Sequence, residues 1–394
     1  MAATEFPVRA LPLRALVHGA GPTGALAALA LADAGWEVSV RDPLHAGSLR
    51  ARSRAYAFNH SSRRLLQRLG LWEPLTGCLV PFTALQLCDQ VLDGAVPFAS
   101  ADLSPTSRRA GAGAVGWIAA HGPLMDVLLQ HLAAHPSIHL QLGGEPQAAI
   151  SPDPAPFQLV VAADGPASPH RQALGIGLWQ RPYRQSCLTA QVELRGLAPG
   201  QAWELFRAEG PFAVLPLGPG QAQLVWSAPT ERCRQLEQLS PTAFLDRLAA
   251  LLPADLEPDA LLDQPRVFPV ALAVARRLSR QRSVLVGESA HRCHPVGGQG
   301  LNLCWRDVAT LHRLARRVSA GRLRPDHLPG RYGRQRWPDL LLTLACTDLL
   351  VHLFSNRSPL LLPLRRLAVV LLSRLAPLRR LCLGVMTEGP CRPW

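Results

Sequence analysis

The sequence predicts an α/β protein in which a nucleotide-binding domain is interrupted by an antiparallel β-sheet and followed by a helical lobe. Three observations lead to this prediction. Glycine-rich turns follow apolar strands at residues 19–24 and again at residues 287–300. Four apolar segments between residues 183 and 228 are separated by Gly and Pro turns. Residues 346–394 are apolar stretches broken by arginine pairs, and 394 residues suffice for two domains.

The first glycine-rich turn has the sequence GAGPTG at residues 19–24. An apolar strand ends at Val17, a helix is expected over residues 22–34, and a second strand over residues 38–40 leads to Asp42. Strand, turn, helix and a following acid in this order are typical of a dinucleotide-binding βαβ unit. The similar sequence GAGAVG at residues 111–116 lacks a preceding apolar strand, so we expect a loop there.

The glycines and the acid of this unit have separate expected roles. Gly19 permits the tight turn, Gly21 lets the backbone approach a pyrophosphate, and Gly24 lets the helix pack closely on the strand. Asp42 is expected to accept hydrogen bonds from the adenosine ribose and to repel a 2′-phosphate. The pattern therefore favours FAD or NAD over NADP.

Two further segments are candidates for binding the nucleotide. Arg52 and Arg54 follow the second strand in a polar connection, where they could contact a phosphate or simply face solvent. Asp164 and Gly165 end an apolar strand over residues 159–163. This acid could hold a ribose or an ordered water, and the alternative is a plain Asp-Gly turn.

The second glycine-rich stretch follows the apolar run that ends at Val286. Pro295, Gly297, Gly298 and Gly300 lie within six residues, and a helical pattern begins at about residue 301. A glycine-rich turn that opens a helix presents backbone N–H groups and partial positive charge to a ligand. It suits a pyrophosphate or a polar ring edge, although an ordinary glycine-rich loop has the same composition.

Between these motifs the sequence predicts helices over residues 61–69, 124–132 and 241–252, and a hairpin turn at residues 93–94. The four segments between residues 183 and 228 predict strands of an antiparallel sheet inserted into the nucleotide-binding domain. A ligand pocket is expected where the two domains meet.

Charge is distributed unevenly along the chain. All 41 basic residues are Arg, so Schiff-base and P-loop lysine chemistry is excluded. Residues 265–394 hold 22 Arg and six acids, a net charge of +16, which leaves −3 for residues 1–264 of the total +13. Apolar stretches with Arg pairs favour a helix on an anionic membrane surface, and the alternative is a packed lobe with a solvated basic face. No nucleic-acid partner is expected, because no basic motif interleaved with aromatic residues is present.

The nine Cys are scattered without a CxxC pair, which predicts a reducing compartment and a cytoplasmic protein. Glu288, His291, Cys293 and His294 are residue types that bind metals, but no second cluster completes a coordination shell. We therefore expect no metal site.

Three motifs together resemble the aromatic-ring hydroxylase family of FAD-dependent monooxygenases. They are GAGPTG with Asp42, ADGPASPHR at residues 163–171, and GESAHRCHPVGGQGLN at residues 287–302. Within that family the chain is most similar to the ubiquinone-biosynthesis (polyprenylphenol) hydroxylases. Weaker similarities to this branch include Arg54-Ala55-Tyr56-Ala57 and the basic helical C-terminal segment. The resemblance covers essentially the whole chain.

The resemblance implies FAD as the cofactor and assigns its contacts. Asp42 would bind the adenosine ribose, Arg54 and Asp164 would face the pyrophosphate and the nicotinamide path, and Glu288 would contact the ribitol. The loop 295–302 would lie along the isoalloxazine, and its expected cofactor-binding residues are Pro295, Gly298, Gln299, Gly300 and Asn302. Two positions depart from the pattern: Glu288 stands where the wider family has Asp, and Cys304 where the branch has Gly.

The resemblance also implies a domain division. A Rossmann-type FAD-binding domain would comprise residues 1–80, 110–175 and 270–345. The substrate-binding β-sheet domain would comprise residues 81–109 and 176–269, and a basic, apolar helical lobe residues 346–394.

The implied reaction is hydroxylation of a polyprenylated phenol or quinone precursor, with NADH or NADPH and O2 as co-substrates. His294, His291 and Tyr183 are weak candidates for a base that activates the phenol. Other enzymes of quinone biosynthesis and a membrane surface are candidate partners. Two alternatives remain open: a flavin reductase of the same fold that acts on an isoprenoid, and a non-catalytic protein that binds prenyl lipids or scaffolds other enzymes.

Overall fold

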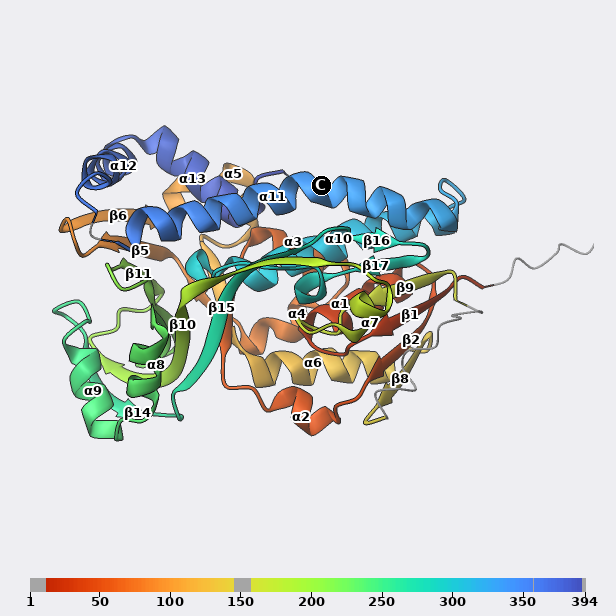
Figure 1. Ribbon diagram of the computed structural model, residues 1–394, viewed down its shortest axis with the longest axis horizontal. Coiled ribbons are helices and arrows are strands. Elements are labelled where there is room, and N and C mark those ends of the chain that lie inside the picture. Colours follow the sequence, from red (N-terminus) through yellow and green to blue (C-terminus); the bar gives the residue numbers. More distant parts are fainter. Residues whose placement is uncertain (1–11, 145–156, 357, 392–394) are drawn as a thin grey trace, which may run out of the picture.

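The computed structural model describes residues 12–144, 157–356 and 358–391. A parallel sheet lies at one end of the molecule and a larger mixed sheet at the other, and helix α11 (Leu328–Phe354) runs along one side of both (Figure 1). Parts of the predicted FAD-binding domain, residues 1–11 and 145–156, and residues 392–394 of the predicted lobe lie outside the described residues. The two sheets confirm the predicted α/β class.

The parallel sheet has the strand order β16-β17-β9-β1-β2-β8. Its strands are β1 (Arg14–His18), β2 (Glu37–Asp42), β8 (Ile138–Leu142), β9 (Leu159–Ala162), β16 (Ser279–Arg280) and β17 (Ser283–Leu285). All neighbours except β16 and β17 pair in parallel. The two predicted glycine-rich motifs follow β1 and β17, which both pair with β9, so the sheet brings together two motifs that are distant in the sequence.

Helix α1 (Pro22–Asp33) packs against both α6 (His121–Ala134) and α10 (Gln299–Ser319). It is apolar around most of its circumference because neighbours cover it on several sides. Gly24 is required here, since a Cβ on it would lie 1.9 Å from the carbonyl oxygen of Gly19. The predicted close approach of helix and strand is therefore confirmed.

The mixed sheet has the order β18-β15-β10-β13-β12-β11-β5-β6, and β14 pairs with β10. Its strands are β5 (Ala84–Asp89), β6 (Gly94–Ala99), β10 (Leu178–Arg195), β11 (Gln201–Phe206), β12 (Phe212–Gly218), β13 (Gln221–Pro229), β14 (Glu257–Leu261), β15 (Arg266–Ala275) and β18 (His291–Arg292). The pairing is antiparallel except between β11 and β5, which are 112 or more residues apart and parallel. Helices α8 (Thr230–Glu237) and α9 (Pro241–Ala249) cover one face.

The remaining elements lie around these two sheets. They are α2 (Ala46–Arg50), α3 (His60–Arg68), α4 (Trp72–Leu75), α5 (Pro105–Ala110), α7 (Pro169–Ala173), α12 (Leu362–Arg374), α13 (Ala376–Glu388) and a small sheet of β3 (Ala55–Phe58), β7 (Gly116–Ala120) and β4 (Val80–Phe82). The hairpin at residues 93–94 is confirmed, and so is the loop at residues 111–116 except for Gly116, which begins β7. The connection at residues 46–54 differs from expectation, because its first five residues form α2.

Buried or half-buried ion pairs attach the C-terminal helices to distant parts of the chain. Arg365 on α12 donates two hydrogen bonds to Asp89, at 3.0 and 2.5 Å, and neither side chain is exposed. Arg379 on α13 binds Asp102 at 2.9 Å. Glu388 at the end of α13 pairs with Arg64. These contacts position α12 and α13 beside β6 and α3.

Among the described residues, one helix, Pro325–Phe354, has the length and apolar composition needed to cross a membrane, and 39% of its most apolar window is buried within the protein. Its N-terminal half contributes Tyr332, Arg336 and Asp339 to the interior. Because these polar groups are bound inside the fold, this half of α11 belongs to the protein core.

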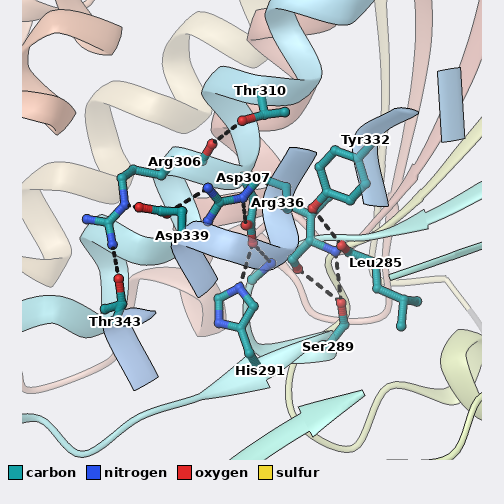
Figure 2. Close-up of polar contacts among 12 residues, drawn as sticks. Leu285, Ser289, His291, Arg306, Asp307, Thr310, Tyr332, Arg336, Asp339 and Thr343 are labelled. Atoms are coloured by element: carbon teal, nitrogen blue, oxygen red, sulfur yellow. Dashed lines mark hydrogen bonds and ion pairs between the residues drawn. The ribbon is translucent and has the colours of Figure 1, made fainter. Parts of the chain in front are cut away.

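Asp307 on α10 is the centre of a buried polar network (Figure 2). One carboxylate oxygen accepts hydrogen bonds from the Gly287 backbone N–H at 2.8 Å and from His291 at 2.7 Å. The other accepts from Arg336 on α11 at 2.6 Å. Asp307 thus joins both long helices to the turn that begins the second glycine-rich motif.

The network continues along α11. Arg336 and Arg306 both donate to Asp339, at 2.7 and 2.9 Å, and Arg306 also donates to Thr343. The Tyr332 hydroxyl donates to the Leu285 carbonyl of β17 at 2.8 Å. Each buried charge therefore has an opposite charge beside it, which offsets part of the cost of removing it from water.

Replacing Asp307 with Asn is expected to lower the free energy of unfolding at pH 7 by about 3 kcal/mol, because a buried charge loses its partner. Although burial alone raises the pKa of Asp307, the nearby His291 and Arg336 lower it to about 2. Because its pKa is lower in the folded state, ionised Asp307 adds about 2 kcal/mol to the free energy of unfolding at pH values above its unfolded-state pKa. This contribution disappears as the pH falls from about 4 to about 2. Urea unfolding at several pH values measures it.

The control is Asp326→Asn, since Asp326 forms an ion pair with Arg324 in which both side chains are exposed. We expect it to change stability by less than about 0.5 kcal/mol. A stability difference between wild type and Asp307→Asn that stays constant from pH 5 to pH 2 would contradict the assigned pKa.

Candidate active site

A cavity of about 930 Å³ lies between the parallel sheet and the mixed sheet. It extends from the turn after β1 to the uncovered face of the mixed sheet and reaches α13. Twelve of the fifteen residues predicted from the sequence line it: Gly19, Gly21, Asp42, Arg54, Asp164, Glu288, His291, Pro295, Gly298, Gln299, Gly300 and Asn302. The other three, Gly24, His294 and Tyr183, are not among the described residues that line it.

The nucleotide end of the cavity is formed by β1, β2 and the turn between β1 and α1. Asp42 accepts hydrogen bonds from the backbone N–H groups of Ala20 at 2.7 Å and Leu44 at 2.8 Å. This holds the carboxylate at the mouth of the turn. A Cβ on Gly21 would meet no atom within 4 Å, so open space faces this residue where a pyrophosphate is expected. The turn therefore fits the adenosine and pyrophosphate parts of FAD.

Asp164 lies on the opposite side of the same turn. Its two carboxylate oxygens accept hydrogen bonds from the Ser168 hydroxyl at 2.6 Å and from the His170 backbone N–H at 3.0 Å. These bonds organise the start of α7, where Ser168 has a strained positive φ of 22°. Asp164 thus shapes its own turn while it lines the cavity, and its contact with a cofactor stays a prediction.

Arg54 lines the cavity and is held there by neighbours that the sequence reasoning did not assign. Its Nε donates to the Tyr56 hydroxyl at 2.9 Å, and this hydroxyl contacts His121 at 2.9 Å. Burial by itself lowers the pKa of Arg54, but Tyr56 and Glu288 raise it above its ordinary value. The guanidinium therefore stays charged and oriented. The sequence held a signal for this contact: Arg54 and Tyr56 are two residues apart at the start of β3, and alternate residues of an extended chain point to the same face.

The loop before α10 is shaped by two successive left-handed glycines, Gly297 with φ 65° and Gly298 with φ 61°. Asn302 fastens it: its amide donates to the carbonyls of Ala57 and Gly298, both at 2.7 Å. Its oxygen accepts from the Asn59 backbone at 3.0 Å. The loop thus presents the N-terminal end of a 21-residue helix to the cavity, which suits an electron-rich ring edge.

The two departures from the family pattern lie at different depths. Glu288 is exposed to the cavity, so its longer side chain has room there. Cys304 is 4% exposed, and its sulfur lies 3.3 Å from the place of a Cβ on Gly287. Cys304 therefore fills the space between α10 and the Gly287 turn.

The three candidate bases have other partners in the structure. His291 belongs to the Asp307 network and is 2% exposed. His294 is fully buried, and burial lowers its pKa to about 3, so it is neutral at pH 7. The Tyr183 hydroxyl donates to Asp348 at 2.6 Å, and burial together with that carboxylate raises its pKa well above 10. Their predicted role as bases has no support from these contacts.

Glu204 on β11 was missed by the sequence reasoning. Its carboxylate lines the cavity and accepts a hydrogen bond from the Gly297 N–H at 3.3 Å. Burial raises the pKa of Glu204 to about 7. An acid within the otherwise apolar segment AWELF could have marked Glu204 as a candidate site residue. Its contact with Gly297 could not be predicted, because the two residues are 93 positions apart in the sequence.

Comparisons with known proteins identify the family of this chain. A family model described as an FAD binding domain matches residues 156–338. The ubiquinone hydroxylase UbiL from Rhodospirillum rubrum is 32% identical, over 96% of this chain and 91% of its own length. The 3-demethoxyubiquinol 3-hydroxylase from Escherichia coli is 29% identical, over 94% of this chain and 97% of its own.

Solved structures agree on the fold. The p-nitrophenol 4-monooxygenase PnpA from Pseudomonas putida superposes with a TM-score of 0.74 at 19% identity, covering 96% of this chain and 99% of the other. The protein is an FAD-dependent monooxygenase. Because UbiL is related over nearly the whole chain and both glycine-rich motifs meet at one cavity, this protein belongs to the FAD-dependent aromatic-ring hydroxylases, in the branch of the ubiquinone-biosynthesis hydroxylases.

Proposed function

We propose that this protein hydroxylates the aromatic ring of a polyprenylated phenol or quinone precursor, with NADH or NADPH and O2 as co-substrates, in quinone biosynthesis. The observation that carries the proposal is one continuous cavity, which joins the two nucleotide motifs to an apolar sheet face. The names of UbiL and of the Escherichia coli relative support a ubiquinone precursor as the substrate class.

FAD, when bound, would supply the redox chemistry, namely hydride exchange with a nicotinamide and activation of O2. The chain's own residues bind and orient the reactants. Asp42 and the turn at Gly21 hold the nucleotide half, and the loop from Pro295 to Asn302 holds the ring half. The Arg54 guanidinium provides a fixed positive charge between them, where phosphates or the anionic reduced cofactor require one.

The sheet end of the cavity suits a prenylated ring. Its wall is largely apolar, and it includes Phe82, Leu85, Ala213, Leu215, Val225, Phe268 and Val270. Leu383 and Met386 on α13 close the cavity from the C-terminal side. Such a wall excludes water from the reacting atoms, which limits side reactions of activated oxygen.

The C-terminal helices carry a surface that suits a membrane. Six apolar side chains between 37% and 87% exposed lie there: Leu360, Leu364, Leu367, Val370, Leu375 and Leu381. Arg366, Arg374 and Arg380 are exposed among them. We call these nine residues the basic apolar face. It includes Arg380 and Leu381 of α13, and other residues of α13 line the cavity, so a protein in the cytoplasm could collect an insoluble prenylated phenol from an anionic bilayer.

The first experiment is the visible absorption spectrum of the purified protein, followed by aerobic turnover with a polyprenylated phenol. We expect an oxidised-flavin spectrum near one FAD per chain, and a hydroxylated product that carries oxygen from ¹⁸O₂, measured by mass spectrometry. A reduced isoprenoid product would favour the reductase alternative. Tight phenol binding without stimulated NAD(P)H oxidation would favour the non-catalytic alternative.

Replacing Asp42 with Ala is expected to weaken FAD binding about 10- to 100-fold, because a hydrogen bond to a charged group contributes about 1.5–3 kcal/mol. Titration of the apoprotein with FAD, followed by flavin fluorescence, measures this. Glu37→Ala is the matched control, since Glu37 begins the same strand and is exposed in a pair with Arg14. Equal FAD affinity of the Asp42 and Glu37 variants would exclude Asp42 as a ribose ligand.

Reversing the charges of Arg366, Arg374 and Arg380 to Glu is expected to reduce vesicle binding at least about a hundredfold, because each basic residue contributes about 1 kcal/mol near an anionic surface. Co-sedimentation with phosphatidylglycerol-containing vesicles measures it, and binding of the wild type should weaken as salt is added. The control reverses Arg247, Arg277 and Arg322, which are exposed outside α12 and α13. Equal losses in both triple variants would show that only net charge matters.

A further inference from the structure

We propose that Glu204 accepts the phenolic proton: its carboxylate receives a hydrogen bond from the substrate hydroxyl and takes up that proton while the ring is hydroxylated. The inference rests on the proposed function, because it assumes a phenol in the cavity. It assigns a catalytic role to a residue on the substrate-facing sheet, which the three motifs do not include.

The position of Glu204 follows from the register of four neighbouring strands. Glu204 on β11 is opposite Ala213 on β12, Ala213 is opposite Val225 on β13, and Val225 is opposite Thr189 on β10. Directly opposite residues in antiparallel strands point to the same face. All four line the cavity, so Glu204 belongs to a row of side chains that crosses the substrate side of the sheet.

The next row along the strands faces the other way. Trp203, Val214, Leu224 and Ala190 pair in the same manner, and they pack in the apolar core with α8 and α9. The alternation of a strand therefore determines that Glu204 faces the cavity rather than the core. Glu204 is the only acid in β11.

Glu204 is chemically distinct within this wall. The described cavity residues from β5, β10, β11, β12, β13 and β15 are Leu85, Thr189, Ala202, Glu204, Ala213, Leu215, Val225, Ser227, Phe268, Pro269, Val270 and Ala271. Glu204 is the only titratable side chain in that set; β18, at the opposite edge of the described sheet, adds His291 and Arg292 to the cavity lining. A carboxylate at a largely apolar wall costs free energy of desolvation, and a bound phenol hydroxyl would replace part of the lost hydration.

Glu204 also adjoins the cofactor loop. One of its oxygens accepts the Gly297 N–H at 3.3 Å, and Gly297 belongs to the loop expected to lie along the isoalloxazine. No Arg or His of the described residues forms an ion pair with Glu204. The carboxylate thus lies between the loop that would hold the flavin ring and the apolar wall, and it has acceptor capacity left for a substrate hydroxyl.

The other titratable groups on the elements next to β11 differ from Glu204 in their partners or in their pKa. On β5, Asp89 is bound to Arg365, and burial raises the pKa of Cys88; β12 has no titratable side chain. In the loop before Gly297, burial raises the pKa of Cys293 to about 12 and lowers that of His294 to about 3.

Cys187 on β10 and Arg207 on β11 complete these surroundings. Burial raises the pKa of the Cys187 thiol well above its ordinary value, so it is neutral. Arg207 is bound to Glu209. Since burial raises the pKa of Glu204 to about 7, a base near working pH is available, which is the condition that favours general base catalysis.

The proton transfer balances without a further reactant. The phenolic O–H bond breaks, its proton goes to a Glu204 oxygen, and the electron pair stays on the phenolic oxygen and enriches the ring carbon, which as the nucleophile takes up the oxygen atom. When that carbon loses its hydrogen to water and aromaticity returns, Glu204 gives its proton back to the phenolic oxygen. The oxygen atom and the electrons come from O2 and NAD(P)H, and Glu204 changes only its protonation.

The test compares wild type, Glu204→Gln and the matched control Glu193→Gln, an exposed acid on β10. Gln keeps the size and the acceptor for the Gly297 N–H but takes up no proton. The probes are 2-prenylphenol and its methyl ether, which lacks the donor. Binding to the FAD-loaded protein without nicotinamide is measured from the flavin absorbance.

We expect wild type and Glu193→Gln to bind 2-prenylphenol up to about tenfold more tightly at pH 8 than at pH 6, because a group with a pKa near 7 changes from mostly protonated to mostly ionised. Binding of the methyl ether, and all binding by Glu204→Gln, should be independent of pH. Equal pH dependence in Glu204→Gln, or no binding of 2-prenylphenol to wild type, overturns the assignment.

Turnover separates proton transfer from positioning. With normal FAD content, Glu204→Gln should hydroxylate with a kcat about 10²- to 10⁴-fold lower and without the rise through pH 7 seen in wild type. A variant kcat within about twofold of wild type overturns the proposal. Wild type that hydroxylates no phenol refutes the proposed function instead, and the binding series still decides whether Glu204 accepts a phenol hydrogen bond.

Discussion

The buried carboxylate of Asp307 is the interaction on which the arrangement of this protein depends. It binds the backbone of the Gly287 turn, His291 of β18 and Arg336 of α11, so one side chain joins the parallel sheet, the mixed sheet and the longest helix. A buried charge persists only where opposite charges and hydrogen bonds surround it. The second glycine-rich motif therefore begins from a position that three separate elements determine.

The buried acids of the framework and the acid at the cavity wall differ in their partners. In the framework, the buried acids Asp307, Asp339 and Asp89 have arginine partners, and their role is to hold elements together. At the cavity wall, Glu204 has a single weak backbone donor, and its pKa moves toward 7. Framework acids that are bound to arginines keep the fold rigid, while a wall acid with few partners is able to exchange a proton.

Much of the site could be predicted because its signals are local. GAGPTG with Asp42, and the loop from Pro295 to Asn302, each encode a turn and a helix start within about 25 residues, and both line the cavity as expected. The bases His291, His294 and Tyr183 were chosen by residue type alone. Their actual partners include Asp307 and Asp348, and such pairings across the fold leave no mark in the nearby sequence.

The sequence by itself determined the fold class, the FAD motifs and the family, because glycine turns, strand alternation and helix starts depend on residues a few positions apart. Tertiary structure alone decided that Arg365 meets Asp89 across 276 residues, that β11 pairs in parallel with β5, and that Glu204 faces the cavity beside Gly297. These outcomes follow from strand register and from the burial of charge, which exist only once distant segments have packed together.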